Sequence, residues 1–260
     1  MKIAEVTKLI EDFAPLSIQE SWDNAGMQVG NSQAEATGAL LCLDVTEAIV
    51  EEAVKKGINL IITHHPLLFR GLKSITGKTI VERVVIKAIK SDVTIYSAHT
   101  NMDSAWGGVS HLIAKKIGLE NVEVLCPQSG NAEVGLGVVG NLQHIENALE
   151  FMDRVKKVFA VKTVRYSGDV SKPIRRVAIC GGAGSEFVRD AMDCDADVLI
   201  TGDIKYHEFM SGSEGLLLVD IGHYESECFI KELFNEIITK KIPNFAVHYA
   251  ELEKNPINYL

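Results

Sequence analysis

The 260-residue sequence has few cysteines, and none of them forms a C-x-x-C pair. The five cysteines are scattered and odd in number, which argues against a disulfide framework and against a thiolate zinc site. They fit a reducing compartment, so we expect a cytoplasmic protein. The cysteines are Cys42, Cys126, Cys180, Cys194 and Cys228.

Long apolar runs are also absent. No uninterrupted apolar stretch is long enough to cross a bilayer, so we expect no membrane partner. The N-terminus opens directly into an amphipathic pattern, with Ile3, Val6 and Ile10 at helical spacing. It lacks the apolar core of a secretory signal, so we expect no such signal here.

The sequence has no dense run of lysine and arginine. Its net charge is -9 and its pI is about 5.4, so its surface repels phosphate backbones. This balance argues against nucleic acid as a partner. The hydrophobic fraction of 47% and charged fraction of 23% are typical of a globular protein, and the length suits two lobes.

Strand and helix patterns alternate along the chain, which predicts an α/β fold. We expect two pseudo-equivalent lobes, each with a mainly parallel sheet and flanking helices. The irregular, polar stretch 126–132 places the boundary between lobes 1–125 and 126–260. The predicted helices are 3–13, 46–56, 81–90, 109–117, 145–158, 187–192 and 225–239. The predicted strands are 39–43, 60–62, 94–97, 134–139, 161–166, 176–180, 198–201 and 216–220.

An internal repeat supports the two lobes. Residues 42–63 align with residues 180–201 without a gap, and both copies end in Ile-Thr. After the next predicted strand of each copy, His99-x-x-x-Asp103 corresponds to His223-x-x-x-Glu227. The repeat therefore predicts a shared site in the cleft between the lobes.

Three predicted strand ends carry histidine or acidic residues, and active sites of α/β sheets gather at such ends. Neighbouring side chains of an extended segment point to opposite sides, so His64 and His65 suit two different ions. A carboxylate such as Glu227 can bridge two ions about 4 Å apart. We therefore predict two divalent ions of iron, zinc, manganese or cobalt. The predicted ligands are His64, His65, Asp103, His223 and Glu227.

Other polar residues near the strand ends are candidates for catalysis. His99 is expected to orient a ligand or carry protons rather than bind metal. His207 is a second proton carrier, and Lys205 is a candidate phosphate contact; an ordinary surface loop is the alternative for both. The turn 181–185 can present backbone N–H groups to a phosphate, although a plain tight turn is the alternative. Its candidate residues are Gly182, Gly184 and Ser185.

Near the N-terminus, Trp22 stands in a turn with Asp23 and Asn24. A large aromatic residue in this setting is expected to be a packing anchor rather than a stacking platform.

Five segments closely resemble the GTP cyclohydrolase I type 2 homologues, also called the NIF-three-like family. The resemblance spans nearly the whole chain and implies a two-lobed α/β fold, a dinuclear metal centre and a toroidal homohexamer. It assigns the metal-ligand roles to the same five residues that spacing selects. The short middle of the chain is typical of the compact form, without an inserted domain. The segments are Trp22–Gly26, Thr63–Pro66, His99–Asp103, Thr201–His207 and Gly222–Glu227.

These patterns predict a metal-dependent hydrolase, and the resemblance implies that it acts on a purine nucleotide. The resemblance indicates GTP, with ring opening, formate release and closure to dihydroneopterin triphosphate. A phosphoesterase-type dinuclear hydrolase is the second hypothesis. The third is a non-catalytic, metal-binding regulatory or scaffold ring.

Overall fold

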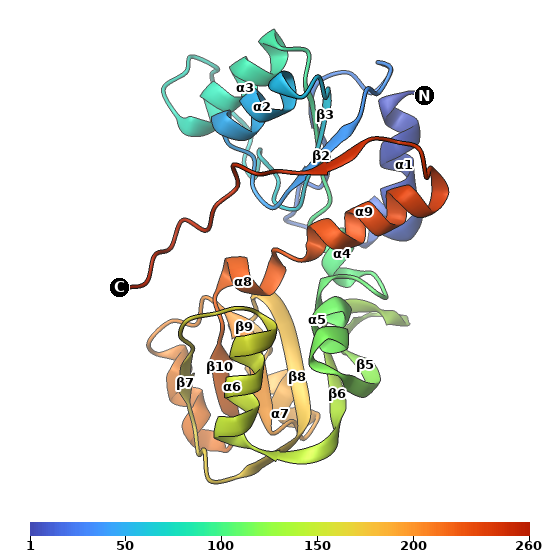
Figure 1. Ribbon diagram of the computed structural model, residues 1–260. Helices are drawn as coiled ribbons and strands as arrows, with labels where there is room; N and C mark the ends of the chain where they lie inside the picture. Colours follow the sequence, from blue (N-terminus) through green and yellow to red (C-terminus); the bar gives the residue numbers. More distant parts are fainter. The chain divides into compact units, whose positions relative to one another are not determined.

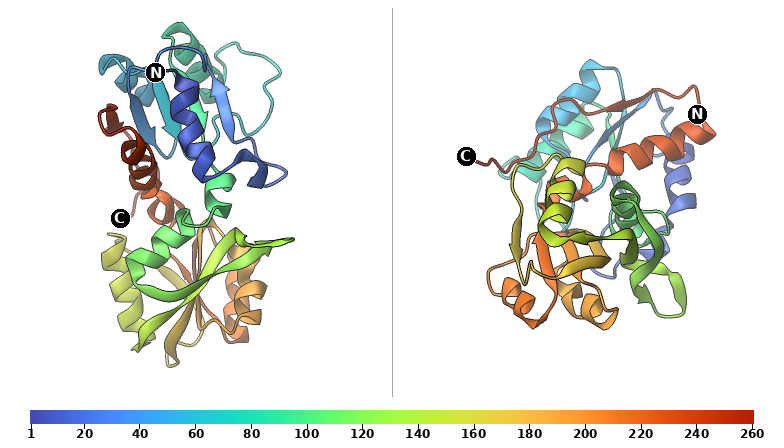
Figure 2. Two further views of the ribbon diagram at one scale, coloured as in Figure 1. Left: turned by 90° about the vertical axis from the view of Figure 1, so that its right-hand side faces the viewer. Right: turned by 60° about the horizontal axis from the view of Figure 1, so that its bottom comes forward.

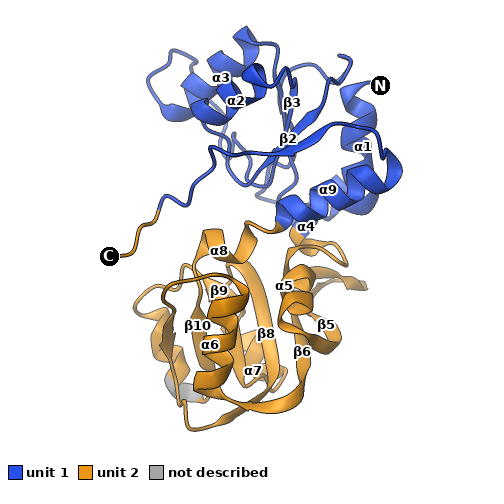
Figure 3. Ribbon diagram, viewed as in Figure 1, with its two compact units in different colours: residues 1–102, 230–256 blue, residues 103–229, 257–260 orange. Residues whose placement is uncertain are grey.

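The chain folds into two compact units in a computed structural model that describes residues 1–212 and 215–260 (Figure 1; Figure 3). Unit 1 contains Met1–Met102 and Ile230–Pro256. Unit 2 contains Asp103–Phe229 and Ile257–Leu260. Unit 1 is therefore formed by two separate segments of the chain, and most of unit 2 lies between them in the sequence. This division differs from the boundary expected at residue 125.

Unit 1 contains a five-stranded sheet with the order β1-β4-β3-β2-β11. All neighbours are parallel except β1 and β4, so a mainly parallel sheet is present here. Its strands are β1 (Gly26–Val29), β2 (Ala39–Cys42), β3 (Leu60–Thr63), β4 (Thr94–Ser97) and β11 (Val247–Tyr249). Its helices are α1 (Ile3–Phe13), the 3-10 turn η1 (Leu16–Ile18), α2 (Glu47–Lys55), α3 (Ile80–Lys90) and α9 (Ile230–Lys241), and α4 (Thr100–Ser104) crosses the boundary.

Helices cover both faces of this sheet, with α2 and α3 on one face and α1 and α9 on the other (Figure 2). Every residue of β2, β3 and β4 is consequently buried. Leu40, Ile61 and Ile95 pack in one cluster with Ile49 and Val84 from α2 and α3. Burial on both faces explains why these strands are continuous apolar runs.

Unit 2 contains a six-stranded sheet with the order β5-β6-β8-β9-β10-β7. Only β8, β9 and β10 run parallel to one another, so the prediction of a mainly parallel sheet is wrong for this unit. Its strands are β5 (Leu119–Gln128), β6 (Asn131–Asn147), β7 (Arg165–Ser167), β8 (Pro173–Ala183), β9 (Val198–Gly202) and β10 (Leu217–Asp220). Its helices are α5 (Val109–Ile117), α6 (Ala148–Val158), η2 (Ser185–Phe187), α7 (Val188–Asp193), η3 (Glu208–Glu214) and α8 (His223–Glu227).

The stretch 126–132 is not a linker but the tip of the β5–β6 hairpin. Cys126 pairs with Leu136, and Gln128 pairs with Asn131 across the turn. Gly130 adopts a positive φ of 87°, which the tight turn needs. The polar composition that suggested a boundary is instead the composition of an exposed hairpin end.

Several helices and strands begin or end at residues other than those predicted. The helix predicted over 145–158 begins at Ala148, because the Asn147 side chain accepts a hydrogen bond from the Leu149 N–H at 2.9 Å. The long helix predicted over 225–239 is two helices, α8 and α9, which belong to different units. The strand predicted over 161–166 begins only at Arg165.

The repeat detected in the sequence corresponds to a shared topology. The strands β2, β3 and β4 are parallel neighbours in that order, as are β8, β9 and β10. The last strand of each triplet leads into a short helix, α4 or α8. Across the described part of the chain, no helix has the length and apolar character to span a membrane.

A loop of residues 64–79 links β3 to α3, and one carboxylate binds the end of the loop that precedes α3. Glu82 Oε2 accepts hydrogen bonds from the Thr76 N–H at 2.8 Å, the Thr76 hydroxyl at 2.9 Å and the Lys78 N–H at 3.1 Å. The Thr79 hydroxyl donates to Glu82 Oε1 at 3.2 Å. The bonds from Thr76, followed by those from Lys78 and Thr79, outweigh burial and lower the pKa of Glu82 to about 2.

We predict that Glu82→Gln lowers the midpoint of thermal unfolding at pH 7. The pKa of Glu82 is depressed on folding, so its stabilisation is fully present above its unfolded pKa of 4.5 and is lost as the pH falls toward 2. The difference between variant and wild type should therefore shrink below pH 4.5. Calorimetry across this range tests the prediction. Glu150→Gln, an exposed first-turn acid of α6, is the control, and an equal effect of both variants would contradict it.

Candidate functional site

Three histidines of unit 1 gather at the carboxyl ends of two neighbouring strands. His64 and His65 follow β3, and His99 follows β4, which pairs with β3 in parallel. Each histidine offers one ring nitrogen, and these nitrogens lie within 4.8 Å of one another. Such a cluster could hold a metal ion, because imidazole nitrogen is a common ligand of divalent transition metals.

The rings of the adjacent histidines are held by bonds to their Nδ1 atoms. His64 Nδ1 lies 2.8 Å from the Ala98 carbonyl oxygen, and His65 Nδ1 lies 2.9 Å from Asp44 Oδ1. Both oxygens only accept, so each Nδ1 donates and the Nε2 lone pair is directed away from the bond. Metal-binding histidines usually have such an outer hydrogen bond.

His99 has the same arrangement through Asp23. Its Nδ1 donates to Asp23 Oδ1 at 2.9 Å, and the other Asp23 oxygen accepts from the N–H and hydroxyl of Thr100. Burial raises the pKa of Asp23, but the hydrogen bonds from His99 and Thr100 prevail and hold that pKa at about 2. Asp23 therefore stays ionised and determines which nitrogen of His99 carries the proton.

The corresponding strand end of unit 2 carries His223 and Glu227, one turn apart on α8. His223 Nδ1 donates to Asp203 Oδ2 at 2.8 Å, and His223 Nε2 lies 3.0 Å from Glu227 Oε2. The Glu227 side chain is buried, whereas that of Asp203 is half exposed. Unit 2 thus also places an oriented imidazole beside a carboxylate.

Asp103 lies in the same part of unit 2. Burial, and then the nearby carboxylates of Asp103 and Glu227, raise the pKa of the buried Cys180 thiol. The two predicted acidic ligands therefore both face the end of β8. In the protein without metal, this environment favours the neutral thiol of Cys180.

Gly182, near the end of β8, makes room for Glu227. A Cβ on Gly182 would lie 2.2 Å from Glu227 Oε1 and 3.4 Å from His223 Cε1. The Gly182 N–H already donates to Ser226 Oγ at 2.9 Å, so a phosphate would have to compete with that bond. At Gly184 a Cβ would meet the Cβ of Cys180 at 2.4 Å. Packing thus explains both glycines without a phosphate.

Two of the predicted phosphate-binding residues, Lys205 and Ser185, interact with the carboxylate of Glu208. Glu208 accepts from the Lys205 N–H at 2.8 Å, and its Oε1 lies 3.6 Å from Lys205 Nζ. The bonds from Lys205 and the Ser185 side chain lower the pKa of Glu208. Lys205 is 84% exposed, so a phosphate can still reach it. His207 is exposed beside Tyr206 and belongs to none of the candidate metal clusters found among the described residues.

Two aromatic side chains border the histidines of unit 1. Trp22 is 62% exposed, and its ring centroid lies 5.9 Å from that of His99. Phe69 is 49% exposed, and its centroid lies 5.3 Å from that of His99. The expectation that Trp22 is a packing anchor is wrong, because most of its surface is open to solvent.

Sequence reasoning missed the acids that orient the histidines. Asp44 comes two residues after β2, and Asp203 directly follows β9. Asp203 adopts a positive φ of 55°, which is uncommon for a residue other than glycine. The sequence did contain a signal for these two acids. Each follows a buried strand, and the next parallel strand of the same sheet is followed by the histidine that the acid orients.

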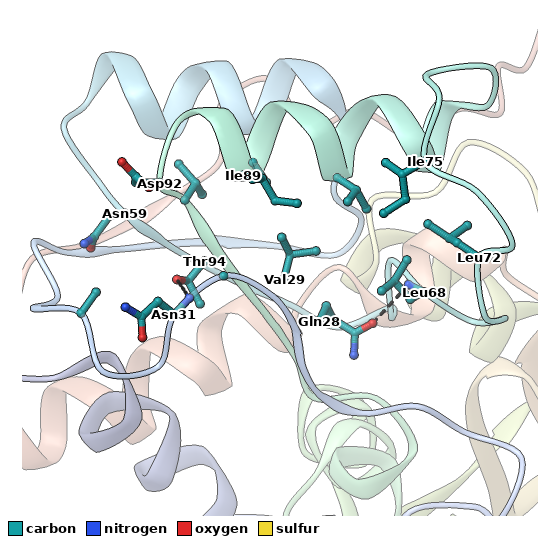
Figure 4. A pocket seen from close by; sticks show the side chains of 15 residues that line it. Gln28, Val29, Asn31, Asn59, Leu68, Leu72, Ile75, Ile89, Asp92 and Thr94 are labelled. Carbon is teal, nitrogen blue, oxygen red and sulfur yellow. Dashed lines mark hydrogen bonds between the residues drawn. The ribbon is translucent and has the colours of Figure 1, made fainter.

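A pocket of about 670 Å³ lies elsewhere in unit 1, beneath α3 (Figure 4). Leu68, Leu72 and Ile75 line one end, and Asn31 and Asp92 lie toward the other. None of the predicted site residues lines it. The candidate site is therefore defined by the chemistry of the strand ends and not by this pocket.

The fold and the side chains at the strand ends together define a class of protein. It is an α/β protein of two units in which histidines at strand ends are oriented by oxygen acceptors and accompanied by buried carboxylates. Groups of this kind could bind a metal ion.

Comparison with known proteins gives the family. Residues 1–256 match the family Duf34/NIF3 (NGG1p interacting factor 3), and the chain belongs to it. It is 36% identical over the full length of both chains to the "GTP cyclohydrolase 1 type 2 homolog" of Clostridium perfringens. It is 37% identical to the protein of that name from Lactococcus lactis, over 98% of each chain. These matches confirm the resemblance expected from the five segments.

Solved structures show the same fold. A Bacillus cereus protein related to NIF3 superposes with a TM-score of 0.91 at 26% identity, covering 100% of this chain and 99% of that one. A Staphylococcus aureus protein superposes with a TM-score of 0.91 at 29% identity, with the same coverage.

We predict that Gly182→Ala displaces the Glu227 carboxylate and lowers the content of bound divalent metal. Gly130→Ala is a matched control, because Gly130 also has a positive φ but a Cβ there meets nothing within 4 Å. Both variants should lose about 1–2 kcal/mol of stability from backbone strain. Elemental analysis after metal loading separates them. Equal metal content in both would show that Glu227 does not need the space at Gly182.

Proposed function

We propose that this protein is a dinuclear metal-dependent hydrolase that acts on a purine nucleotide. The proposal takes its ligands from both units, as the sequence pattern and the family resemblance suggest. His99 carries protons and is not a ligand in this proposal. The proposed ligands are His64, His65, Asp103, His223 and Glu227.

One observation carries the proposal: each proposed histidine ligand has its Nδ1 bonded to a fixed oxygen. The acceptors are the Ala98 carbonyl for His64, Asp44 for His65 and Asp203 for His223. Each Nε2 is consequently presented with a defined direction, which a binding site for a metal ion requires. The donors are nitrogen and oxygen without thiolate, which fits iron, zinc, manganese or cobalt.

When bound, such ions lower the pKa of water and polarise substrate oxygens. The protein's own contribution to proton transfer is His99. With Asp23 holding its Nδ1 proton, His99 can take a proton from the attacking water on Nε2 and return it to a leaving nitrogen. The ionised Asp23 keeps the ring of His99 oriented throughout this transfer.

The curated relatives carry the name "GTP cyclohydrolase 1 type 2 homolog", which supports GTP as the candidate substrate. In the proposed reaction, water adds at C8 of guanine and opens the five-membered ring, and a second water hydrolyses the resulting formamide to release formate. After rearrangement of the ribose, closure of the new ring expels one water and gives dihydroneopterin triphosphate. The exposed Lys205 is the proposed contact of the triphosphate, and His207 a second proton carrier. The homohexamer implied by the resemblance stays a prediction, which light scattering would test.

A nucleotide panel tests the function. We expect metal-loaded protein to release formate from GTP and to bind about two ions per chain. Formate and phosphate are assayed separately, because phosphate without formate would instead indicate a phosphoesterase. Metal binding without turnover of any nucleotide would contradict the hydrolase and favour a regulatory or scaffold protein.

We predict that His99→Ala retains both metal ions and loses about 10²- to 10⁴-fold in turnover, the usual contribution of a general base. His223→Ala should lose metal first. Elemental analysis and turnover are measured on the same samples, with the exposed His144→Ala as a control. A His99→Ala protein that lacks one ion would make His99 a direct ligand.

A further inference from the structure

Trp22 and Phe69 form an aromatic rim beside the histidines of unit 1, and both side chains are largely exposed to solvent. The two rings meet the His99 ring edge-on, at interplanar angles of 72° and 87°. Exposed aromatic rings of this size are costly to leave in water, and large exposed apolar groups often mark binding sites.

Hydrogen bonds hold the two chain segments that carry the rim. The Asn24 side chain donates to the Leu68 carbonyl at 2.8 Å, which ties the turn of Trp22 to the segment of Phe69. Asp23, between Trp22 and Asn24, is bonded to His99 and Thr100. The Leu68 N–H donates to Gln28 Oε1 at 3.1 Å.

These bonds hold the two segments that carry the rings, and both rings also contact the ring of His99. Rigid aromatic side chains bind with a small entropic cost, because little freedom remains to be lost. The hydrogen bonds of Asp23, Asn24 and Leu68 therefore distinguish these segments from an ordinary flexible surface loop.

We propose that the aromatic rim, Trp22 and Phe69, binds the flat aromatic ring of the substrate by stacking and brings it to His99. The proposal rests on the proposed function and specifies which residues select the substrate class. Stacking on an aromatic side chain tolerates different bases, so the rim recognises a purine or pterin ring rather than one particular nucleotide. Substrates without such a ring lose this contact.

The test uses tryptophan fluorescence. The chain has two tryptophans, so Trp106→Phe leaves Trp22 as the single reporter. The full-length, metal-loaded variant is titrated with guanosine, with GTP and with inorganic triphosphate, and free tryptophan amide corrects for absorption. We expect guanosine and GTP to quench Trp22, and triphosphate to leave its emission unchanged.

Substitutions then test the rim itself. Phe69→Leu should weaken guanosine binding about 5- to 100-fold, and Phe69→Tyr should retain it. Tyr166→Leu, at a side chain of equal 49% exposure in unit 2, is the matched control. In the assay, Trp22→Leu should raise KM for GTP while metal content stays unchanged.

The outcomes separate this proposal from the proposed function. Unchanged guanosine affinity in Phe69→Leu, or no quenching of Trp22, overturns the rim while formate release from GTP still supports the hydrolase. A blue-shifted Trp22 emission that depends on protein concentration also overturns it, because a second copy would then cover the rim. Quenching without turnover of any nucleotide keeps the rim and overturns the hydrolase.

Discussion

The candidate site depends on one interaction, the hydrogen bond between a histidine Nδ1 and a fixed oxygen. An imidazole has two similar nitrogens and a ring that can turn, so a histidine alone specifies neither a proton position nor a direction. The bonds to Ala98, Asp44, Asp23 and Asp203 settle both. Three of these oxygens are carboxylates, which also favour a cation close to the ring.

The sheets explain how those bonds form. The ends of β2, β3 and β4 lie side by side, because these parallel strands pair without a register shift. The same holds for β9 and β10 in unit 2, whereas β8 pairs with β9 irregularly between Ile179 and Ala183. Asp44 after β2 can therefore reach His65 after β3, and Asp203 after β9 can reach His223 after β10. The buried strands are stiff, so small polar groups at their ends are positioned without a large framework of their own.

The site also needs space for the buried Glu227 carboxylate, and a glycine provides this space. Gly182 stands where any side chain would strike Glu227, and the Ser226 hydroxyl binds its N–H in place of a ligand. The carboxylate can thus lie buried against His223. A glycine-rich turn that suggests phosphate binding in a sequence can equally be a place where a side chain of another element must fit.

Much of the local structure follows from the residues themselves. Thr46 and Thr79 cap α2 and α3 with their hydroxyls, and Gly118 ends α5 at a positive φ of 81°. These features involve neighbours in the chain, so the sequence predicts them well. Spacing likewise singled out His64, His65, His99 and His223, because chemistry-bearing residues after buried strands are visible without coordinates.

Non-local contacts decided the rest. The hairpin at residues 126–132 looks like a linker because its polar residues reveal nothing about the strand they pair with. The return of α9 and β11 to unit 1 depends on pairing of β11 with β2, far away in the sequence. Trp22 shows the same limit for a single residue. A large aromatic residue was expected to pack in the interior, yet Trp22 is 62% exposed, while its neighbours Asp23 and Asn24 bond to distant residues. Residue types thus determined which chemistry the chain can perform, whereas only tertiary structure decided which oxygen orients each histidine and which aromatic rings stay exposed beside it, because both depend on contacts between distant segments.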